Sequence, residues 1–160
     1  MGYTTEFDGR IAIVPPLSEK EIEYINAFSD TRRMDREKGP YYVGDNTNGM
    51  NVEADVRDPN RPPEGQPGLW CNWEVVEDGN FIEWNGAEKF YDAELWMQYI
   101  IDHFICEDPI ARRENSHFVF LGEHMCNGEI LAEGEEQGDV WKLVVRNNVV
   151  SVKKPTISWD

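Results

Sequence analysis

The sequence predicts an α+β domain, an antiparallel sheet of hairpins with two helices packed on one face. Short runs rich in β-branched and aromatic residues recur along the chain, and turn residues such as Asp-Gly and Asn-Asn separate them. Two other stretches repeat apolar residues at helical spacing. A length of 160 residues with 40% apolar and 12% aromatic side chains suffices for one hydrophobic core. We therefore expect a single domain over residues 1–160.

The N-terminal part of the chain predicts one strand followed by one helix. Residues 11–14 form an aliphatic run that stops at two prolines, which is typical of a short buried strand. Ser18 then offers an N-cap, and Glu21 three residues later completes a capping box. The helix is expected to run from residue 19 to about residue 31.

Residues 44–68 show no hydrophobic periodicity, and their prolines alternate with Gly, Asn and Asp. Connections of this length within a compact domain are uncommon and are often functional. We therefore expect a long Pro/Gly-rich loop, which serves either as a binding loop or as a surface insertion without a role.

Residues 70–85 carry a strong hairpin signal. Asp78-Gly79 is a favoured type I′ turn, and a two-residue turn fixes the pairing register. That register places two tryptophans opposite each other on a buried face. On the other face it places Glu74 opposite Glu83, and like charges in that position are destabilising. This carboxylate pair is therefore a candidate functional feature.

A second helix is predicted after the hairpin. Asn85 is the expected N-cap, with the carboxylate of Glu88 in the first turn. Residues 93–104 repeat apolar side chains at i, i+3, i+4 and i+7, so one face of this helix should be buried. The helix is expected to end before Pro109 and to lie across the sheet.

The last third of the chain predicts a β-meander. Its breaks are expected at Asn127-Gly128, at Gly138 and at Asn147-Asn148. The order of all elements is then β-α-β-β-α followed by the meander, and the first five match the start of a ferredoxin-like unit. The four strands are expected at residues 117–125, 129–135, 140–146 and 149–154.

The charge balance limits the kinds of partner that this protein can bind. The formal net charge is −16, from 31 acidic and 15 basic side chains. Such a chain is repelled by nucleic acid and by anionic membranes, and it favours a protein with a basic surface. The three cysteines show no paired spacing, the N-terminus lacks the pattern of a signal peptide, and the apolar runs are too short to span a bilayer. We expect a cytoplasmic protein without direct nucleic-acid or membrane partners.

Motifs for catalysis and cofactors are missing from the sequence. It contains no nucleophile elbow and no glycine-rich phosphate-binding motif. His124 and Cys126 alternate on one strand, but no short-spaced pair supplies the further ligands that zinc needs. We therefore expect no metal and no cofactor. The pair Glu74 and Glu83 could serve acid–base chemistry, or it could belong to a solvated acidic surface.

The candidate binding residues fall into two groups. Two stretches without Lys or Arg, residues 62–88 and 114–141, supply strands to one sheet and would focus a negative potential on it. In the other group, basic side chains could meet the phosphates of a ligand, with Lys89 either at a helix N-terminus or simply exposed. Trp70 could anchor an interface. The acidic candidates are Glu74, Glu83, Glu129, Glu133 and Glu135, and the basic ones are Arg32, Arg33 and Lys89.

Four segments carry a resemblance: residues 31–34 (TRRM), 62–73 (PPEGQPGLWCNW), 83–91 (EWNGAEKFY) and 127–130 (NGEI). Together they resemble a family of small uncharacterised accessory proteins of tailed phages and prophages. The resemblance spans most of the chain, and the proline-rich stretch leading into Trp-Cys is its most specific part. It implies phage origin and action in the host cytoplasm, but no activity and no functional residues.

Three functions follow from these observations, in order of preference. The first is a non-enzymatic acidic inhibitor or modulator of a host protein with a basic surface, acting in host takeover or anti-defence and partly mimicking nucleic-acid charge. The second is a protein that sequesters a small ligand or nucleotide signal, with residues 44–68 as a lid. The third is a carboxylate-based enzyme.

Overall fold

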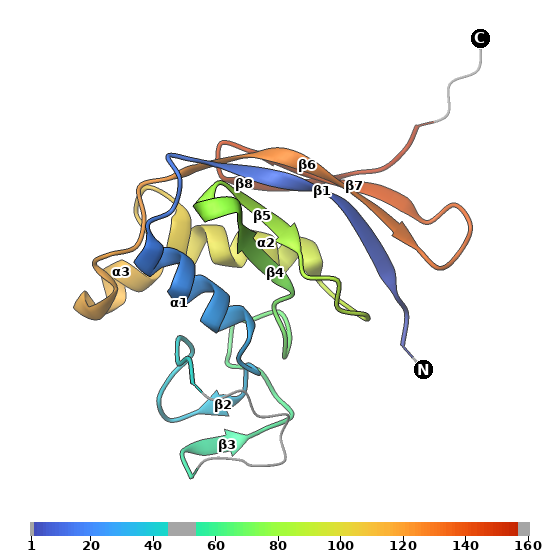
Figure 1. The fold of residues 1–160 in the computed structure, drawn as a ribbon. Helices are drawn as coiled ribbons and strands as arrows, with labels where there is room; N and C mark the ends of the chain where they lie inside the picture. Colours follow the sequence, from blue (N-terminus) through green and yellow to red (C-terminus); the bar gives the residue numbers. More distant parts are fainter. Residues whose placement is uncertain (1, 45–53, 157–160) are drawn as a thin grey trace.

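A computed structural model describes residues 2–44 and 54–156, and it shows one six-stranded antiparallel sheet with helices on one side (Figure 1). This confirms the predicted α+β class. The strands lie in the order β4-β5-β1-β6-β7-β8. Their bounds are β1 Thr5–Val14, β4 Trp73–Val76, β5 Phe81–Trp84, β6 Met125–Gly134, β7 Val140–Arg146 and β8 Val149–Lys153. The helices are α1 Glu19–Ser29, α2 Ala93–Ile100 and α3 Ile110–Glu114.

The order of the central strands is that of a ferredoxin-like unit. β1 lies between β5 and β6 and runs antiparallel to both, while β4 pairs with β5 at one edge. α1 connects β1 to the β4–β5 hairpin, and α2 lies on the connection from that hairpin to β6. β7 and β8 extend the sheet beyond β6, and a small sheet of β2 (Asp35–Arg36) and β3 (Val56–Asp58) lies between α1 and β4 in the sequence.

α1 begins where the sequence predicts. Ser18 Oγ accepts a hydrogen bond from the Glu21 backbone N–H at 3.2 Å, and Glu21 Oε1 accepts one from the Ser18 N–H at 2.9 Å, so the capping box is present. The helix ends at Ser29 rather than at residue 31. β1 starts six residues before the predicted strand, because residues 5–10, which are polar apart from Phe7, form a strand by pairing with β6.

The predicted hairpin register is confirmed. Trp73 pairs with Trp84, and Glu74 pairs with Glu83. Asp78 and Gly79 have φ values of 56° and 88°, which are the positive angles that a type I′ turn requires. The tight turn spans Glu77–Gly79 and is closed by the Asn80 N–H on the Glu77 carbonyl at 3.1 Å.

The second helix starts later than predicted. Asn85 Oδ1 accepts a hydrogen bond from the Ala87 N–H at 2.9 Å, so it caps a local turn only. Lys89 and Asp92 then adopt left-handed angles of 60° and 57°, which interrupt any helix before Ala93. After Ile100 the chain continues as one π-helical turn, Ile101–Ile105.

Two predictions in the last third are wrong. Residues 117–125 are not a strand: Ser116–Phe118 form a 3₁₀ turn, and strand pairing starts only at Met125. Asn127-Gly128 is not a turn either, because β6 runs through it. A Cβ on Gly128 would lie 2.7 Å from the Arg10 carbonyl oxygen, so glycine permits close approach of the two backbones. The β7–β8 hairpin forms as predicted, with its turn at Asn147-Asn148.

The predicted loop at residues 44–68 is partly structured. Residues 45–53 lie outside the described residues. The rest contains β3, which pairs with β2, and the buried Gln66. Gln66 Nε2 donates to the Pro40 carbonyl at 2.7 Å and to the Tyr99 hydroxyl at 3.0 Å, so the end of the loop is anchored to the helical layer.

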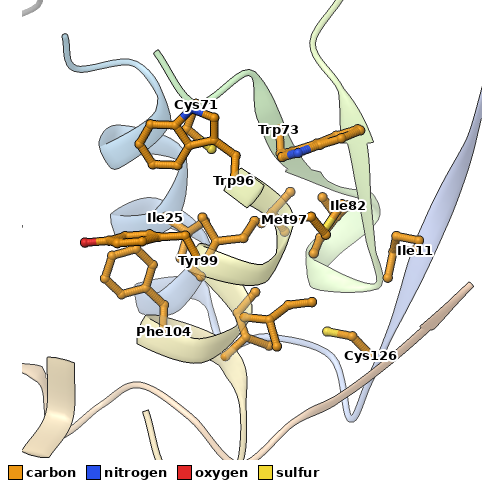
Figure 2. Packing of buried hydrophobic residues seen from close by; sticks show 14 of the residues in the cluster. Ile11, Ile25, Cys71, Trp73, Ile82, Trp96, Met97, Tyr99, Phe104 and Cys126 are labelled. Atoms are coloured by element: carbon orange, nitrogen blue, oxygen red, sulfur yellow. The ribbon is translucent and has the colours of Figure 1, made fainter. Parts of the chain in front are cut away.

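The core lies between the sheet and the helices (Figure 2). Trp73 from β4, Trp96 from α2 and Phe28 from α1 are completely buried there. The indole Nε1 of Trp73 donates to the Ala93 carbonyl at 2.9 Å, which ties the hairpin to the start of α2. In the part of the chain that the structure describes, no helix is long and apolar enough to cross a bilayer.

Side chains from α1 and α2 hydrogen-bond to the backbone at the two edge strands of the sheet. At β4, Asn26 of α1 accepts from the Val75 N–H at 2.8 Å and donates to the Val75 carbonyl at 3.1 Å. At β8, Gln98 of α2 accepts from the Val150 N–H at 2.8 Å and donates to the Asn148 carbonyl at 3.0 Å. These carboxamides stand where the backbone of a further strand would pair.

Replacing Asn26 with alanine should lower the free energy of unfolding by about 1–2 kcal/mol, because two hydrogen bonds to the edge strand are lost. Urea denaturation measures the change. Glu23→Ala, at an exposed position of the same helix, is the control and should change stability by less than about 0.5 kcal/mol. Equal stability of the two variants would show that the Asn26 carboxamide does not hold β4.

Candidate functional site

The outer face of the sheet carries most of the predicted acidic residues. Along β1, Ile11 and Ile13 are buried against the helices, so the alternate residues of the strand face outward. The same alternation orients β4, β5 and β6. Within residues 2–44 and 54–156, the helices all lie on the other side of the sheet (Figure 1). The outward carboxylates of these strands are Glu6, Asp8, Glu74, Glu83, Glu129 and Glu133.

Arg10 is the basic residue at the centre of this acidic area. Its guanidinium lies 2.6 Å from Glu83 Oε2 and 2.8 Å from Glu77 Oε2. It also lies over the ring of Phe81, 4.4 Å from the centroid. Arg10 therefore pairs with Glu83 and relieves part of the repulsion between Glu83 and Glu74.

Glu74 is the member of the Glu74–Glu83 pair that forms no salt bridge with Arg10. Partial burial raises its pKa above the ordinary value, and the negative charges of Asp30 and Glu83 raise it further. The pair Glu74 and Glu83 nevertheless lies on the outer face of the sheet, over which the described residues place no helix that would exclude water from a reaction. Its position gives no support to a carboxylate-based enzyme.

The later acidic candidates divide between the face and a turn. Glu129 lies opposite Arg10 and 4.0 Å from the Lys142 ammonium, and Glu133 lies opposite Glu6. Glu135 lies beyond the end of β6, and its Oε1 accepts a hydrogen bond from the Thr4 N–H at 2.6 Å. The structure therefore brings Glu129 and Glu133 together with Glu74 and Glu83 on one face, and it leaves Glu135 outside.

The part of the outer face formed by β7 and β8 is basic. Lys142 and Arg146 on β7 and Lys153 on β8 are exposed and alternate outward in register with the acidic strands. The outer face is thus negative from β4 to β6 and positive over β7 and β8. Such a division orients a charged partner as well as attracting it.

A cleft of about 630 Å³ lies between the end of α1, residues 67–72 and residues 85–92. Trp70 and Lys89, two of the predicted binding residues, line it together. The other titratable residues in its walls include Asp30, Glu88 and Asp92. The carboxylates outnumber the ammonium group, which disfavours the nucleotide ligand of the second predicted function.

Arg32 and Arg33 do not line this cleft. Arg33 is buried, lies 4.1 Å from the ring centroid of Phe28, and donates to the carbonyls of Thr31 and Pro40 at 3.1 and 3.0 Å and to that of Tyr42. Burial lowers the pKa of its guanidinium to about 10. Arg32 Nε donates to the Pro59 carbonyl at 3.0 Å. Both side chains therefore hydrogen-bond to backbone carbonyls of the segments that follow α1.

The sequence does not predict the buried pair of Glu21 and His124. His124 Nε2 lies 2.8 and 3.0 Å from the two carboxylate oxygens of Glu21, and Nδ1 lies 2.7 Å from the Pro15 carbonyl oxygen. Because both ring nitrogens face acceptors, the doubly protonated imidazolium fits this site. The residues lie 103 positions apart, and the only sequence signal was the place of Glu21 in the capping box.

The two pKa values follow from these contacts. Burial alone would lower the pKa of His124, but its hydrogen bonds to Glu21 and Pro15 outweigh burial and raise that pKa above 6.5. Burial alone would raise the pKa of Glu21, but hydrogen bonds from His124, Ser18 and the Gly122 N–H outweigh it and lower that pKa below 4.5. The pair is therefore an ion pair that joins α1 to the start of β6.

The cysteines and histidines do not assemble into a metal site among the described residues. Burial raises the pKa of the Cys71 thiol to about 11 and that of Cys126 to about 12, so both are protonated at neutral pH. His103 stacks on Tyr99 with ring centroids 3.8 Å apart, and burial lowers its pKa to about 4. It is neutral and lies 2.6 Å from the Tyr41 hydroxyl.

Two surfaces therefore remain as candidates: the divided outer face of the sheet and the cleft beside Trp70. The first holds four of the predicted acidic residues, and the second holds Trp70 and Lys89. No protein-family model matches the chain, and neither the curated proteins nor the solved structures contained a match.

Proposed function

We propose that this protein binds a basic surface of another protein through the acidic part of its outer sheet face. The observation that supports this most is the alignment of outward carboxylates on four adjacent strands, with Arg10 as the basic residue among them. Neighbouring strands lie about 4.8 Å apart, so the acidic area is roughly 14 Å wide from β4 to β6. This width accommodates a helix or a loop of a partner.

The charge of the whole chain supports a basic partner. A net charge of −16 repels nucleic acid and draws positively charged surfaces at long range. Many basic protein surfaces exist to bind nucleic acid, so the acidic area would compete with nucleic acid for them and act as an inhibitor or modulator. The resemblance to small phage proteins supports a host protein as the partner and the host cytoplasm as the place of action.

Affinity capture from a bacterial lysate tests the proposal when matched charge variants are used. The first variant is Glu74→Gln, Glu83→Gln, Glu129→Gln and Glu133→Gln on the outer face. The second replaces the exposed Glu19, Glu23, Glu37 and Glu64, away from that face, with Gln. Both reduce the formal net charge of −16 by four, so they differ only in where the charge is lost.

The unmodified protein and the second variant should retain the same partner, and the outer-face variant should lose it. Added duplex DNA should release the partner if it is a nucleic-acid-binding protein. Binding should weaken steeply between low and physiological ionic strength, because exposed charges are screened. Retention by the outer-face variant, or retention indifferent to salt, would contradict the proposal.

A further inference from the structure

The cleft beside Trp70 contains a buried hydrogen-bond donor without an acceptor. Trp96 is completely buried on α2 (Figure 2), and its indole Nε1 has no hydrogen-bond partner among the described residues. Trp96 lines the cleft, and so does Gly68, where an added Cβ would lie 3.7 Å from Nε1. The N–H group has almost no accessible surface, and the glycine at position 68 adds no side chain beside it.

An unpaired buried donor normally costs free energy, and native structures pair nearly all of them. By contrast, the other core tryptophan, Trp73, donates to the Ala93 carbonyl at 2.9 Å. An indole N–H can only donate, so the group that satisfies Trp96 must be an acceptor such as a carbonyl oxygen. The cleft of about 630 Å³ has the size of ordinary small-molecule sites.

The walls of the cleft define the rest of the ligand. Leu69, Trp70 and Tyr91 provide apolar and aromatic surface. The exposed carboxylates of Asp30 and Asp92 border it. Asp92 occupies the N-cap position of α2 but makes no capping hydrogen bond through its side chain, so its carboxylate is not used by the helix.

Lys89 is the one Lys or Arg among the described residues that line the cleft. Its stem packs beside Gly2, where an added Cβ would lie 2.6 Å from Lys89 Cδ. Glu88, the residue before it, adds another carboxylate to the wall. The cleft is therefore a negative site with an apolar body and one donor at its buried end.

We propose that this cleft binds a small organic cation with an apolar body and a carbonyl group, the carbonyl accepting from Trp96 Nε1 and the ammonium lying among Asp30, Glu88 and Asp92. This site is separate from the outer sheet face and does not rest on the function proposed for that face. The ligand class also differs from the nucleotide considered as an alternative in the sequence analysis, because a nucleotide requires basic walls and these walls carry more carboxylates than ammonium groups.

Three phenylalanine derivatives of different charge test the proposal: L-phenylalaninamide, a cation; N-acetyl-L-phenylalaninamide, which is neutral; and N-acetyl-L-phenylalanine, an anion close in shape to the neutral probe. All three carry a carbonyl and a benzyl group. Each is titrated into ¹⁵N-labelled protein, and the indole N–H signal of Trp96, assigned with Trp96→Phe, is followed by NMR. The cation should move this signal downfield in a saturable way, the neutral probe should bind more weakly, and the anion should not bind.

The double variant Asp30→Asn, Asp92→Asn should weaken binding of the cation roughly fivefold, since exposed charge pairs contribute modestly. Asparagine tolerates the left-handed angle at position 92, so the fold should be kept. Glu23→Gln, on α1 but outside the cleft, should leave binding unchanged. An unmoved Trp96 signal with all three probes, equal binding of the anion, or unchanged binding in the double variant would overturn the proposal.

Discussion

Replacing Glu21 with alanine is expected to lower the free energy of unfolding by about 4 kcal/mol, because it leaves the His124 imidazolium buried without its carboxylate. The change also removes the acceptor of the Ser18 and Gly122 N–H groups. Urea denaturation near pH 6 measures the effect. Glu21→Gln keeps an oxygen for these N–H groups but loses the charge, so it should be less destabilising than alanine.

The exposed Glu23 on the same helix provides the control, since Glu23→Ala should change stability by less than about 0.5 kcal/mol. If Glu21→Ala and Glu23→Ala were equally stable, the contacts of Glu21 would contribute nothing to the fold. A loss of stability in Glu21→Ala alone would instead show that the pair fixes α1 against the start of β6.

The same pair gives stability a defined pH dependence. The pKa of His124 is raised in the folded state, so its contribution is complete below about pH 6.5 and is lost as pH rises through the raised value. The pKa of Glu21 is lowered, so its contribution is present above about pH 4.5 and is lost as pH falls through the lowered value. Between about pH 6 and 9, the unmodified protein and His117→Gln, at an exposed histidine, should lose more stability than His124→Gln. Parallel pH profiles for all three would rule out this linkage.

Replacing Gly128 with alanine is expected to cost about 3 kcal/mol, the upper end of the usual range for overpacking. The new Cβ would lie 2.7 Å from the Arg10 carbonyl oxygen and 3.0 Å from the Ile11 Cα, and both atoms belong to the backbone of β1. Relief would require β1 and β6 to move apart along the longest ladder of the sheet. Urea denaturation measures the loss of stability.

Glu133→Ala is the matched control, because Glu133 is exposed on the same strand and the change to alanine there adds no atom. That variant should lose less than about 1 kcal/mol. A loss of similar size in Gly128→Ala would show that the two backbones adjust easily and that glycine is not needed there.

Gly128 also shows where reasoning from sequence to fold stops. The hairpin at residues 73–84, the capping box of α1 and the β7–β8 turn were predictable, because neighbours in the sequence encode them. Asn127-Gly128 is an equally good local turn signal, yet its glycine serves a contact with Arg10, more than a hundred positions away. Asn85 likewise gave a valid capping signal but caps only a turn, because Lys89 and Asp92 interrupt the helix after it.

The candidate site divides in the same way. Glu74 opposite Glu83 follows from the hairpin register and was predictable. The ion pair between Arg10 and Glu83 was not predictable, because it depends on the pairing of β1 with β5, which are distant in the sequence. Helical spacing marked Trp96 as a core residue, and it is one. The sequence does not show that its N–H group is unpaired, because this depends on residues 67–72, which come beside Trp96 only in the folded chain.

The carboxamides of Asn26 and Gln98 have a consequence for solubility. Open sheet edges are templates for growth into fibrils, and natural β-proteins block them. Here a helix side chain stands at each edge, so a strand from another molecule would have to displace an amide before it could pair with Val75 or Val150. Together with mutual repulsion at a net charge of −16, this should keep the protein monodisperse at concentrations where an uncapped six-stranded sheet would polymerise.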